Sequence, residues 1–405
     1  MGKRQIGIGM VGYKFMGKTH SHAYRDLPFY FDLDVEPVMR AIAGRDEAGV
    51  RSAASKYGWA SYETDWRKLI ERDDIDLIDI GTPNNTHAEI AIAAACAGKH
   101  IICEKPLAMT SEQAKQMLDA AQGAGVIHMI CHNYRYVPAV RYIKQLISQG
   151  VLGQIYHIRA VYLQDWIMDP EFPLVWRLRK EVCGSGTHGD LMAHSIDLAR
   201  YLVGEITEVS GVMETFIKER PLGEMSGGLN AKLDSAQRGQ VDVDDAVAFL
   251  GKFDNGALGV FEASRFAKGN RNGNKFEING SKGSVRWDME NMNHFELYLE
   301  DDQPGQQGFR TISCTEGVHP FMEAYWPAGH IIGYEHTFIN TAHALMQGIA
   351  TNTNPQPSFE DGYRNQLVLD AVEQSAQSRK WIKVQPSGSA SDKAAEDVAY
   401  KMKEE

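Results

Sequence analysis

The sequence predicts an α/β protein in which an N-terminal, doubly wound parallel sheet precedes an α+β domain with a large, mostly antiparallel open sheet. Short apolar runs alternate with helical segments up to about residue 130, which is typical of right-handed βαβ units. Beyond residue 134, strand-like segments follow one another through turns such as DNG and GSKG, which favours antiparallel pairing. With 405 residues, 43% of them hydrophobic, the chain is long enough for two domains.

In the first domain the elements alternate in chain order. Strands are expected at residues 5–12, 35–44, 76–81, 100–103 and 126–131, and helices at 16–27, 46–58, 66–75, 87–99 and 110–125. In the second domain, helices are expected at 140–153 and 189–204, and strands at 155–166, 208–217, 246–253, 257–266, 275–281, 283–289 and 294–300. The predicted domains are residues 1–132 for dinucleotide binding and 133–385 for substrate binding and oligomerisation, followed by a polar tail at 386–405. The polar, glycine-containing segment 218–245 is expected to be a functional or mobile loop.

Composition limits the functions that the chain can have. The net charge of −11 argues against a nucleic-acid or anionic-membrane surface, because both require clustered positive charge. Five cysteines, an odd number without metal-site spacing, argue against a disulfide framework and a zinc site. We find no signal peptide and no apolar run of about 18 residues that would span a membrane. A small-molecule partner and a cytoplasmic location are therefore expected.

Two overlapping glycine patterns occur near the N-terminus. Gly7, Gly9 and Gly12 spell G-x-G-x-x-G, but this frame lies inside the predicted strand. The frame from Gly12 to Gly17 lies at the strand-to-helix junction, where free backbone N–H groups can meet a pyrophosphate. Lys14 takes the middle position, where it either obstructs the phosphates or points outward and adds positive charge. A βαβ turn without a nucleotide is the alternative.

The second predicted strand ends at Gly44, followed by Arg45, where dinucleotide-binding proteins commonly place an acidic residue. Without that carboxylate, an arginine can pair with a 2′-phosphate, so NADP is possible. Alternatively, Arg45 stacks on adenine and the cofactor is NAD. Two further loops, residues 81–87 and 104–106, follow parallel strands and so lie at the ligand-binding edge of the sheet. Lys105 in the second loop is either functional or an ordinary surface lysine.

Several segments together resemble the glucose-fructose oxidoreductase, inositol dehydrogenase and MocA family (Gfo/Idh/MocA). They are GYKFMGKTHS, GTPNNTHAEIAIAAACAGKHIICEKPLA, HNYRYVPA, WIMDPEFPLVWR and GDLMAHSIDLARYLVG, and the resemblance covers roughly residues 5–384. It implies a Rossmann domain and catalytic roles for Lys105, Asp190 and His194. Within the family, the sequence is most similar to bacterial dehydrogenases of glucosides and anhydrosugars. Thr187 and His188 depart from the small or apolar residues that the family often has before the catalytic aspartate.

Asp190 and His194 are one helical turn apart, so their side chains share a face. An imidazole beside a carboxylate suits proton transfer; alternatively, Asp190 caps the helix and His194 is simply buried, with Asp197 as a structural acid. As a mechanism we expect His194 to take the proton of a sugar hydroxyl, Lys105 to hydrogen-bond the developing alkoxide, and Asp190 to orient the imidazole. The i, i+2 spacing of His20 and His22 faces two directions and argues against a metal site.

The predicted site residues fall into two groups. Cofactor-binding residues are Gly12, Tyr13, Lys14, Phe15, Met16, Gly44, Arg45, Thr82, Pro83, Asn84, His87, Glu104, Lys105, Asn133, Arg135, Trp176 and Arg177, of which the family resemblance implies Asn84, His87, Asn133 and Arg135. Substrate-binding residues are Lys105, Tyr134, Asp165, Trp166, His188, Asp190, His194 and His330. Aromatic side chains suit the flat C–H faces of sugars, which also makes Tyr162, Trp326 and His336 candidates.

The predicted activity is NAD(P)-dependent oxidation of a secondary hydroxyl of a sugar, glycoside or anhydrosugar to a ketone, with C3 of a glucoside as the favoured position. The cofactor is either exchanged or kept bound. Two alternatives stay open: a reductase of oxo-sugars or dihydrodiols, and a regulator that binds dinucleotide without catalysis. We expect a homodimer or homotetramer formed through the C-terminal sheet.

Overall fold

The first sheet of the computed structural model is parallel and six-stranded, in the order β3-β2-β1-β4-β5-β6. The structure describes residues 2–223 and 231–385. The strands are β1 (Arg4–Val11), β2 (Val35–Ala43), β3 (Ser61–Glu63), β4 (Leu77–Ile80), β5 (His100–Cys103) and β6 (His128–Ile130). The doubly wound parallel sheet is therefore confirmed, and β3 is an edge strand that the sequence analysis did not identify.

Helices connect these strands and cover the sheet. They are α1 (Phe15–Tyr30), α2 (Glu47–Tyr57), α3 (Arg67–Ile70), α4 (His87–Cys96) and α5 (Ser111–Ala124). Two C-terminal helices, α9 (Tyr334–Thr351) and α10 (Phe359–Ser378), also pack here. Phe338 and Leu345 of α9 share a core with Ile8 and Leu27 of the first domain, and Phe359 of α10 joins the core around β4 and β5. The chain thus returns to the first domain after building the second.

The second sheet has nine strands in the order β16-β15-β14-β13-β7-β12-β11-β8-β17. Every pairing is antiparallel except β7 with β12, so the predicted open, mostly antiparallel sheet is confirmed. The strands are β7 (Ile155–Leu163), β8 (Ile206–Glu214), β11 (Ala246–Phe253), β12 (Leu258–Ser264), β13 (Gly273–Gly280), β14 (Gly283–Asp288), β15 (His294–Leu299), β16 (Arg310–Ser313) and β17 (Ile382–Lys383).

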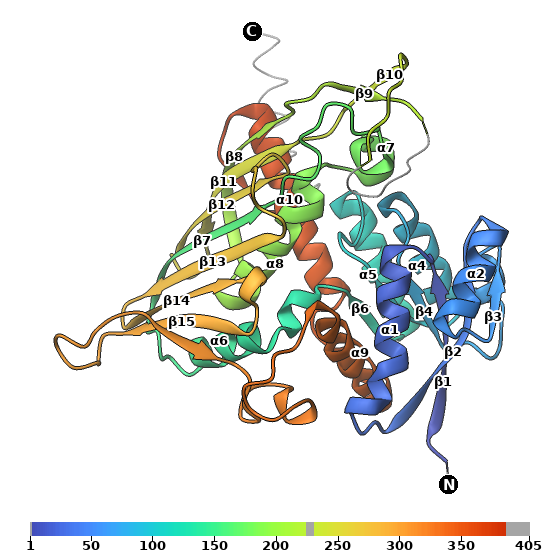
Figure 1. Ribbon diagram of the computed structural model, residues 1–405, viewed down its shortest axis with the longest axis horizontal. Helices are drawn as coiled ribbons and strands as arrows, with labels where there is room; N and C mark the ends of the chain where they lie inside the picture. Colours follow the sequence, from blue (N-terminus) through green and yellow to red (C-terminus); the bar gives the residue numbers. More distant parts are fainter. Residues whose placement is uncertain (1, 224–230, 386–405) are drawn as a thin grey trace.

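The strands of this sheet alternate buried and exposed side chains, as β11 shows most regularly. The buried side packs on α6 (Pro138–Ser148), α8 (Ala193–Leu202) and α10. Figure 1 shows the nine-stranded sheet on one side of the molecule and the parallel sheet on the other, with α8, α9 and α10 between them. This arrangement brings the carboxyl edge of β4 and β5 towards the start of α8.

The segment 218–245 contains regular structure that the sequence analysis did not predict. Within it, β9 (Glu219–Pro221) pairs with β10 (Arg238–Gln240) as an antiparallel ladder. Residues 224–230 and the predicted tail 386–405 lie outside the described residues. In the described ranges, no helix is long and apolar enough to cross a membrane.

Candidate functional site

The turn between β1 and α1 depends on two glycines. Gly12 has a φ of +108°, and a Cβ added there would lie 2.6 Å from the carbonyl oxygen of Gly81. A Cβ on Gly17 would lie 2.2 Å from the carbonyl oxygen of Gly12. Gly7 and Gly9 are inside β1, so the frame from Gly12 to Gly17 is the one at the strand-to-helix junction, as predicted.

The start of α1 has the features of an anion site. No side chain caps the helix, and no acidic residue stands in its first turn. Backbone N–H groups and the positive end of the helix dipole are therefore available to a pyrophosphate. Lys14 is exposed at the N-cap position, and the Phe15 side chain is also exposed. The turn and the start of α1 thus fit the phosphate-bearing part of a dinucleotide. The Lys14 side chain is exposed to solvent.

A carboxylate that the sequence analysis overlooked lies near the end of β2. The Tyr13 ring packs so closely on Gly44 that a Cβ there would lie 2.3 Å from the ring. Tyr13 donates a hydrogen bond of 3.3 Å to Asp46 Oδ2, and Asp46 also caps α2. Arg45 is exposed. An acidic group at this corner suits the ribose hydroxyls of NAD.

His87, which was predicted to bind the cofactor, connects two loops of the protein through its ring nitrogens. The side chain is fully buried, and its Nδ1 and Nε2 each lie 3.0 Å from a carbonyl oxygen, of Pro106 and Thr82 respectively. Asn84 donates 2.9 Å to the carbonyl of Cys183 and so joins this loop to the second domain. Both residues hold the loops at the sheet edge in place.

Lys105 and Asp190, which are 85 positions apart in the chain, meet between the two domains. Lys105 Nζ donates to Asp190 Oδ1 at 2.9 Å and to its backbone carbonyl at 2.7 Å. Arg265, a buried residue just after β12, donates to Asp190 Oδ2 at 2.7 Å. Burial raises the pKa of the Asp190 carboxyl, but Lys105, Arg265 and Arg177 together hold that pKa well below its usual range. The carboxylate is therefore ionised and fixes the ammonium group.

Asp190 lies in a π-helical turn, His188–Met192, that leads into α8. Such turns recur at functional sites. Asp244 anchors the start of the turn, because its Oδ1 accepts from the N–H of Gly186 (2.8 Å) and its Oδ2 from the N–H of His188 (2.7 Å). Asp190 therefore lies in the π-helical turn and His194 in α8, and their shared helical face stays a prediction.

His194 is buried, and the described residues offer no hydrogen bond to either of its ring nitrogens. Its ring lies 4.5 Å from that of Tyr134, centroid to centroid. Burial, together with the charge of Lys105, lowers the pKa of His194 well below its usual range. Because both oxygens of Asp190 are engaged by Lys105 and Arg265, Asp190 orients the lysine, not the imidazole as expected from the sequence.

Four predicted ligand-binding residues are engaged elsewhere. Arg135 is buried and pairs with both oxygens of Asp197 (2.9 and 2.7 Å) and with Asp361 (3.2 Å). Asn133 is buried and donates to Thr337 at 2.8 Å. His188 is buried against the Leu369 carbonyl of α10 at 2.9 Å. Glu104 is buried beside His20. All four side chains thus have structural partners, and their binding roles stay predictions; Asp197 pairs with Arg135, as a structural acid would.

The other predicted substrate-binding residues have different surroundings in the structure. Asp165 accepts from the N–H of Gly269 (3.0 Å) and from Arg271 (3.1 Å), so its carboxylate is occupied. His330 is exposed and bonded to the Pro327 carbonyl at 2.9 Å. Trp166 lies 5.5 Å from the Arg265 guanidinium. Tyr134 donates to or accepts from Tyr162 at 3.0 Å. Trp166 therefore lies near a partner of Asp190, and the Tyr134 ring packs against His194.

Two residues of this site were not predicted. Arg265 follows a strand of alternating pattern, where an arginine resembles an ordinary surface residue. Tyr334, at the start of α9, lies 6.5 Å from Tyr134, ring to ring. Burial raises the pKa of Tyr334 well above its usual range, and the nearby Tyr134, Glu104 and Asp190 add to this.

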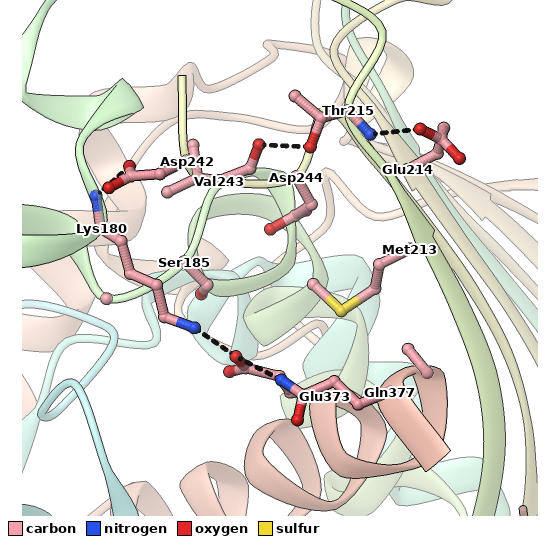
Figure 2. Close-up of a pocket in the computed structure, with 12 residues that line it drawn as sticks. Lys180, Ser185, Met213, Glu214, Thr215, Asp242, Val243, Asp244, Glu373 and Gln377 are labelled. Carbon is pink, nitrogen blue, oxygen red and sulfur yellow. Dashed lines mark hydrogen bonds and ion pairs between the residues drawn. The ribbon is translucent and has the colours of Figure 1, made fainter. Parts of the chain in front are cut away.

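A polar cavity of about 230 Å³ lies apart from these residues. Figure 2 shows Lys180 reaching Glu373 of α10, with Asp244 on the same cavity wall as Val243. None of Lys105, Asp190 or His194 lines it. The cavity therefore borders the back of the loop that carries Asp190 and is not the chemical site.

We expect Arg265→Met to lower kcat by about 100-fold, because Asp190 would lose one of its two cationic partners and release Lys105 from its position. Steady-state oxidation assays measure this effect. The matched control is Arg286→Met, which removes an exposed pair with Glu277 on the second sheet and should leave kcat within about twofold. Equal activity of Arg265→Met and wild type would contradict the role assigned to Arg265.

Comparison with known proteins agrees with this geometry. A model of the "Oxidoreductase family, NAD-binding Rossmann fold" matches residues 6–132, and a "GFO/IDH/MocA C-terminal domain" model matches residues 140–286. Levoglucosan dehydrogenase of Pseudarthrobacter phenanthrenivorans is 44% identical, over 94% of this chain and 98% of that protein. A structure titled "Levoglucosan dehydrogenase, complex with NADH and levoglucosan" is similar with a TM-score of 0.90 and 43% identity, covering 95% of this chain and 100% of that one. An oxidoreductase domain protein from Kribbella flavida has a TM-score of 0.89 and 49% identity, with the same coverage.

Proposed function

The chain belongs to the GFO/IDH/MocA family of NAD-binding oxidoreductases, and from this premise we propose that it oxidises one secondary hydroxyl of an anhydrosugar or glycoside to a ketone. It is a sugar dehydrogenase with NAD as its cofactor. The observation that carries the proposed chemistry is the meeting of Lys105, Asp190 and Arg265 beside an imidazole, His194, that has no hydrogen-bond partner among the described residues.

Each of these residues has a distinct task in the proposed reaction. When bound, NAD accepts the hydride that leaves the substrate carbon. The neutral imidazole of His194 accepts the hydroxyl proton, because its ring nitrogens are free to do so. The ammonium group of Lys105 donates a hydrogen bond to the oxygen as negative charge develops there. Asp190 holds Lys105 in place, and Arg265 holds Asp190.

The cofactor end of the site fits NAD on independent grounds. Gly12 and Gly17 leave a cradle that a Cβ would fill, the uncapped start of α1 offers its N–H groups, and Asp46 supplies a carboxylate near the end of β2. Thr82 and Pro83 are half-buried in the loop after β4. We propose these residues, with Tyr13, Met16 and Trp176, as the lining of the nucleotide site.

We propose an anhydrosugar such as levoglucosan as the substrate to test first, with oxidation at C3. The similarity to levoglucosan dehydrogenase over nearly the whole of both chains supports this choice. Trp166 is partly exposed and lies 5.5 Å from the guanidinium of Arg265, the partner of Asp190; an aromatic ring at this position suits the C–H faces of a sugar ring.

Mass spectrometry of the nucleotide that copurifies with the protein, followed by a panel of sugars, glycosides and anhydrosugars, tests this proposal. Reduced nicotinamide should form fastest with an anhydrosugar or glucoside, and NMR of the product should show a ketone at C3. Assays in the reverse direction with oxo-sugars and dihydrodiols measure the reductase alternative. Oxidation of none of the panel despite bound NAD would contradict the proposal and favour a sensing role.

The pH profile of kcat/KM tests the role of His194. Protonated His194 cannot accept the hydroxyl proton, so activity should fall as the pH drops through the pKa of His194. Because that pKa is lowered from the usual 6.5, kcat/KM should stay constant from pH 7.5 down to 6.5 and decline only below this value. An acid limb centred above pH 6.5 would contradict the assignment.

We propose that the exposed face of the second sheet joins copies of the chain. Apolar side chains gather on it from four neighbouring strands: Tyr156, Val212, Leu250, Leu258 and Val260. Light scattering with size-exclusion chromatography should give a dimer or tetramer, and Val260→Glu should weaken it. The protein contains five free cysteines, which supports a reducing, cytoplasmic location.

A further inference from the structure

A buried group of ionisable side chains lies directly behind Lys105. His20 of α1 contacts Asp79 of β4 through Nδ1 at 2.8 Å and Glu104 through Nε2 at 2.9 Å. Tyr24, one turn further along α1, donates to Asp79 Oδ2 at 2.6 Å. The Cys131 sulfur lies 3.7 Å from His20 Nε2. The three charged side chains are at most 7% exposed.

The surroundings of His20 favour its protonated form: burial lowers the pKa of the imidazole, but Asp79 raises that pKa well above the usual 6.5. An ionised carboxylate only accepts hydrogen bonds, so a ring with a carboxylate oxygen at each nitrogen must donate from both. His20 is therefore an imidazolium between two carboxylates, and neither nitrogen keeps a lone pair for a metal ion. Removing this cation would leave two buried negative charges opposite each other, which is strongly destabilising.

Glu104 connects this cluster to Lys105. One carboxylate oxygen of Glu104 is held by His20, and the other accepts the backbone N–H of Lys105 at 3.2 Å. The Lys105 side chain then extends to Asp190. Helix α1 also begins at the glycine turn, so one helix carries both the start of the cofactor site and the residue that holds Glu104.

We infer that His20 is a positioning residue of the hydride-transfer site: it fixes Glu104, and through Glu104 the backbone of Lys105, relative to the helix that carries the cofactor turn. The inference rests on the proposed role of Lys105 in catalysis. It assigns a function to His20 but not to His22, two residues further along α1. His22 pairs with Asp26, and its side chain is 35% exposed.

The test compares His20→Gln with His22→Gln on the same helix. We expect His20→Gln to lower kcat by about 30-fold, while the KM for the sugar and the Kd for NADH, measured by fluorescence, stay within about threefold of wild type. His22→Gln should leave all three within about twofold. A lowered kcat at a full stoichiometry of NADH binding identifies misplacement of Lys105, because partial loss of folded protein would lower kcat and this stoichiometry in the same proportion.

A double variant distinguishes positioning from charge balance. His20→Gln with Asp79→Asn removes the cation and one carboxylate, so the net charge of the cluster returns to that of wild type. Its Tm should recover relative to His20→Gln, while kcat should stay at least about tenfold below wild type. If His20→Gln alone does not fold, the kcat of the double variant still tests the positioning role of His20.

Two results would overturn the inference. One is a folded His20→Gln enzyme with wild-type kcat. The other is recovery of both Tm and kcat in the double variant, which would show that His20 acts only through charge. Activity retained by Lys105→Met would instead contradict the proposed catalytic role of Lys105, so the two failures are distinguishable.

Discussion

Replacing Lys105 by methionine should lower kcat for sugar oxidation by about 1000-fold while NADH affinity stays within about threefold. Methionine keeps the length of the side chain but removes the ammonium group that donates to Asp190 and would donate to the developing alkoxide. The Lys105 side chain is only 15% exposed, so water replaces this donor less well than it would at the protein surface. Rapid-mixing measurements of NADH formation, with NADH binding followed by fluorescence, separate the chemical step from cofactor binding.

Two comparisons complete this test. Lys115→Met removes an exposed lysine that pairs with Asp119 on α5, and it should leave kcat within about twofold. His194→Ala should lower kcat by about 100-fold, because the proton acceptor is lost while the electrostatic part of the site remains. If Lys105→Met or His194→Ala kept turnover within threefold of wild type, the proposed division of roles would be wrong.

The backbone plan of the protein was predictable because it depends on local patterns. Alternation of short apolar runs with amphipathic helices predicts the parallel sheet, and the position of Gly12 after β1 identifies the correct glycine frame. The helices α9 and α10 were not predicted. Among the predicted sugar-binding candidates Trp326, His330 and His336, only His336 lies in α9, and Phe338 of that helix packs into the first domain's core.

The contacts that the sequence did not predict in the site join residues that are distant in the chain. Arg135 was expected near the cofactor, but Asp197, 62 positions away, takes two of its hydrogen bonds. His188 was expected to shape the substrate pocket, but it faces α10 across 181 positions. Arg265 was missed because its partner Asp190 is 75 positions upstream. Local spacing contains no signal for such pairs, so each required the folded structure.

The partners of Asp190 also come from distant parts of the chain. From its spacing to His194, a carboxylate and imidazole on one helical face were expected to interact. In the structure, Arg265, directly after β12, and Lys105, in the loop after β5, donate hydrogen bonds to the two carboxylate oxygens of Asp190. Charged donors stabilise a carboxylate more than neutral ones do. Asp190 therefore acts on Lys105, and His194 is left with free ring nitrogens.

Replacing Gly12 by valine should weaken NADH binding by more than about 100-fold. The positive φ of Gly12 strains any larger residue, and the Cβ would lie 2.6 Å from the Gly81 carbonyl oxygen, so the turn must shift. A shifted turn removes the N–H groups of α1 from the pyrophosphate. Calorimetric titration with NADH measures the effect, and circular dichroism verifies that the variant is folded.

Strain and site geometry can be separated with two controls. Gly98→Ala places a side chain at a φ of +71° with nothing within 4 Å, so it should lower Tm slightly and leave NADH affinity unchanged. Lys14→Gly should keep NADH affinity within about threefold, because the Lys14 side chain is exposed and the turn is open without it. Normal NADH affinity in Gly12→Val would show that the nucleotide does not bind at this turn. A large loss in Lys14→Gly would instead show that the lysine contributes its charge to the phosphates.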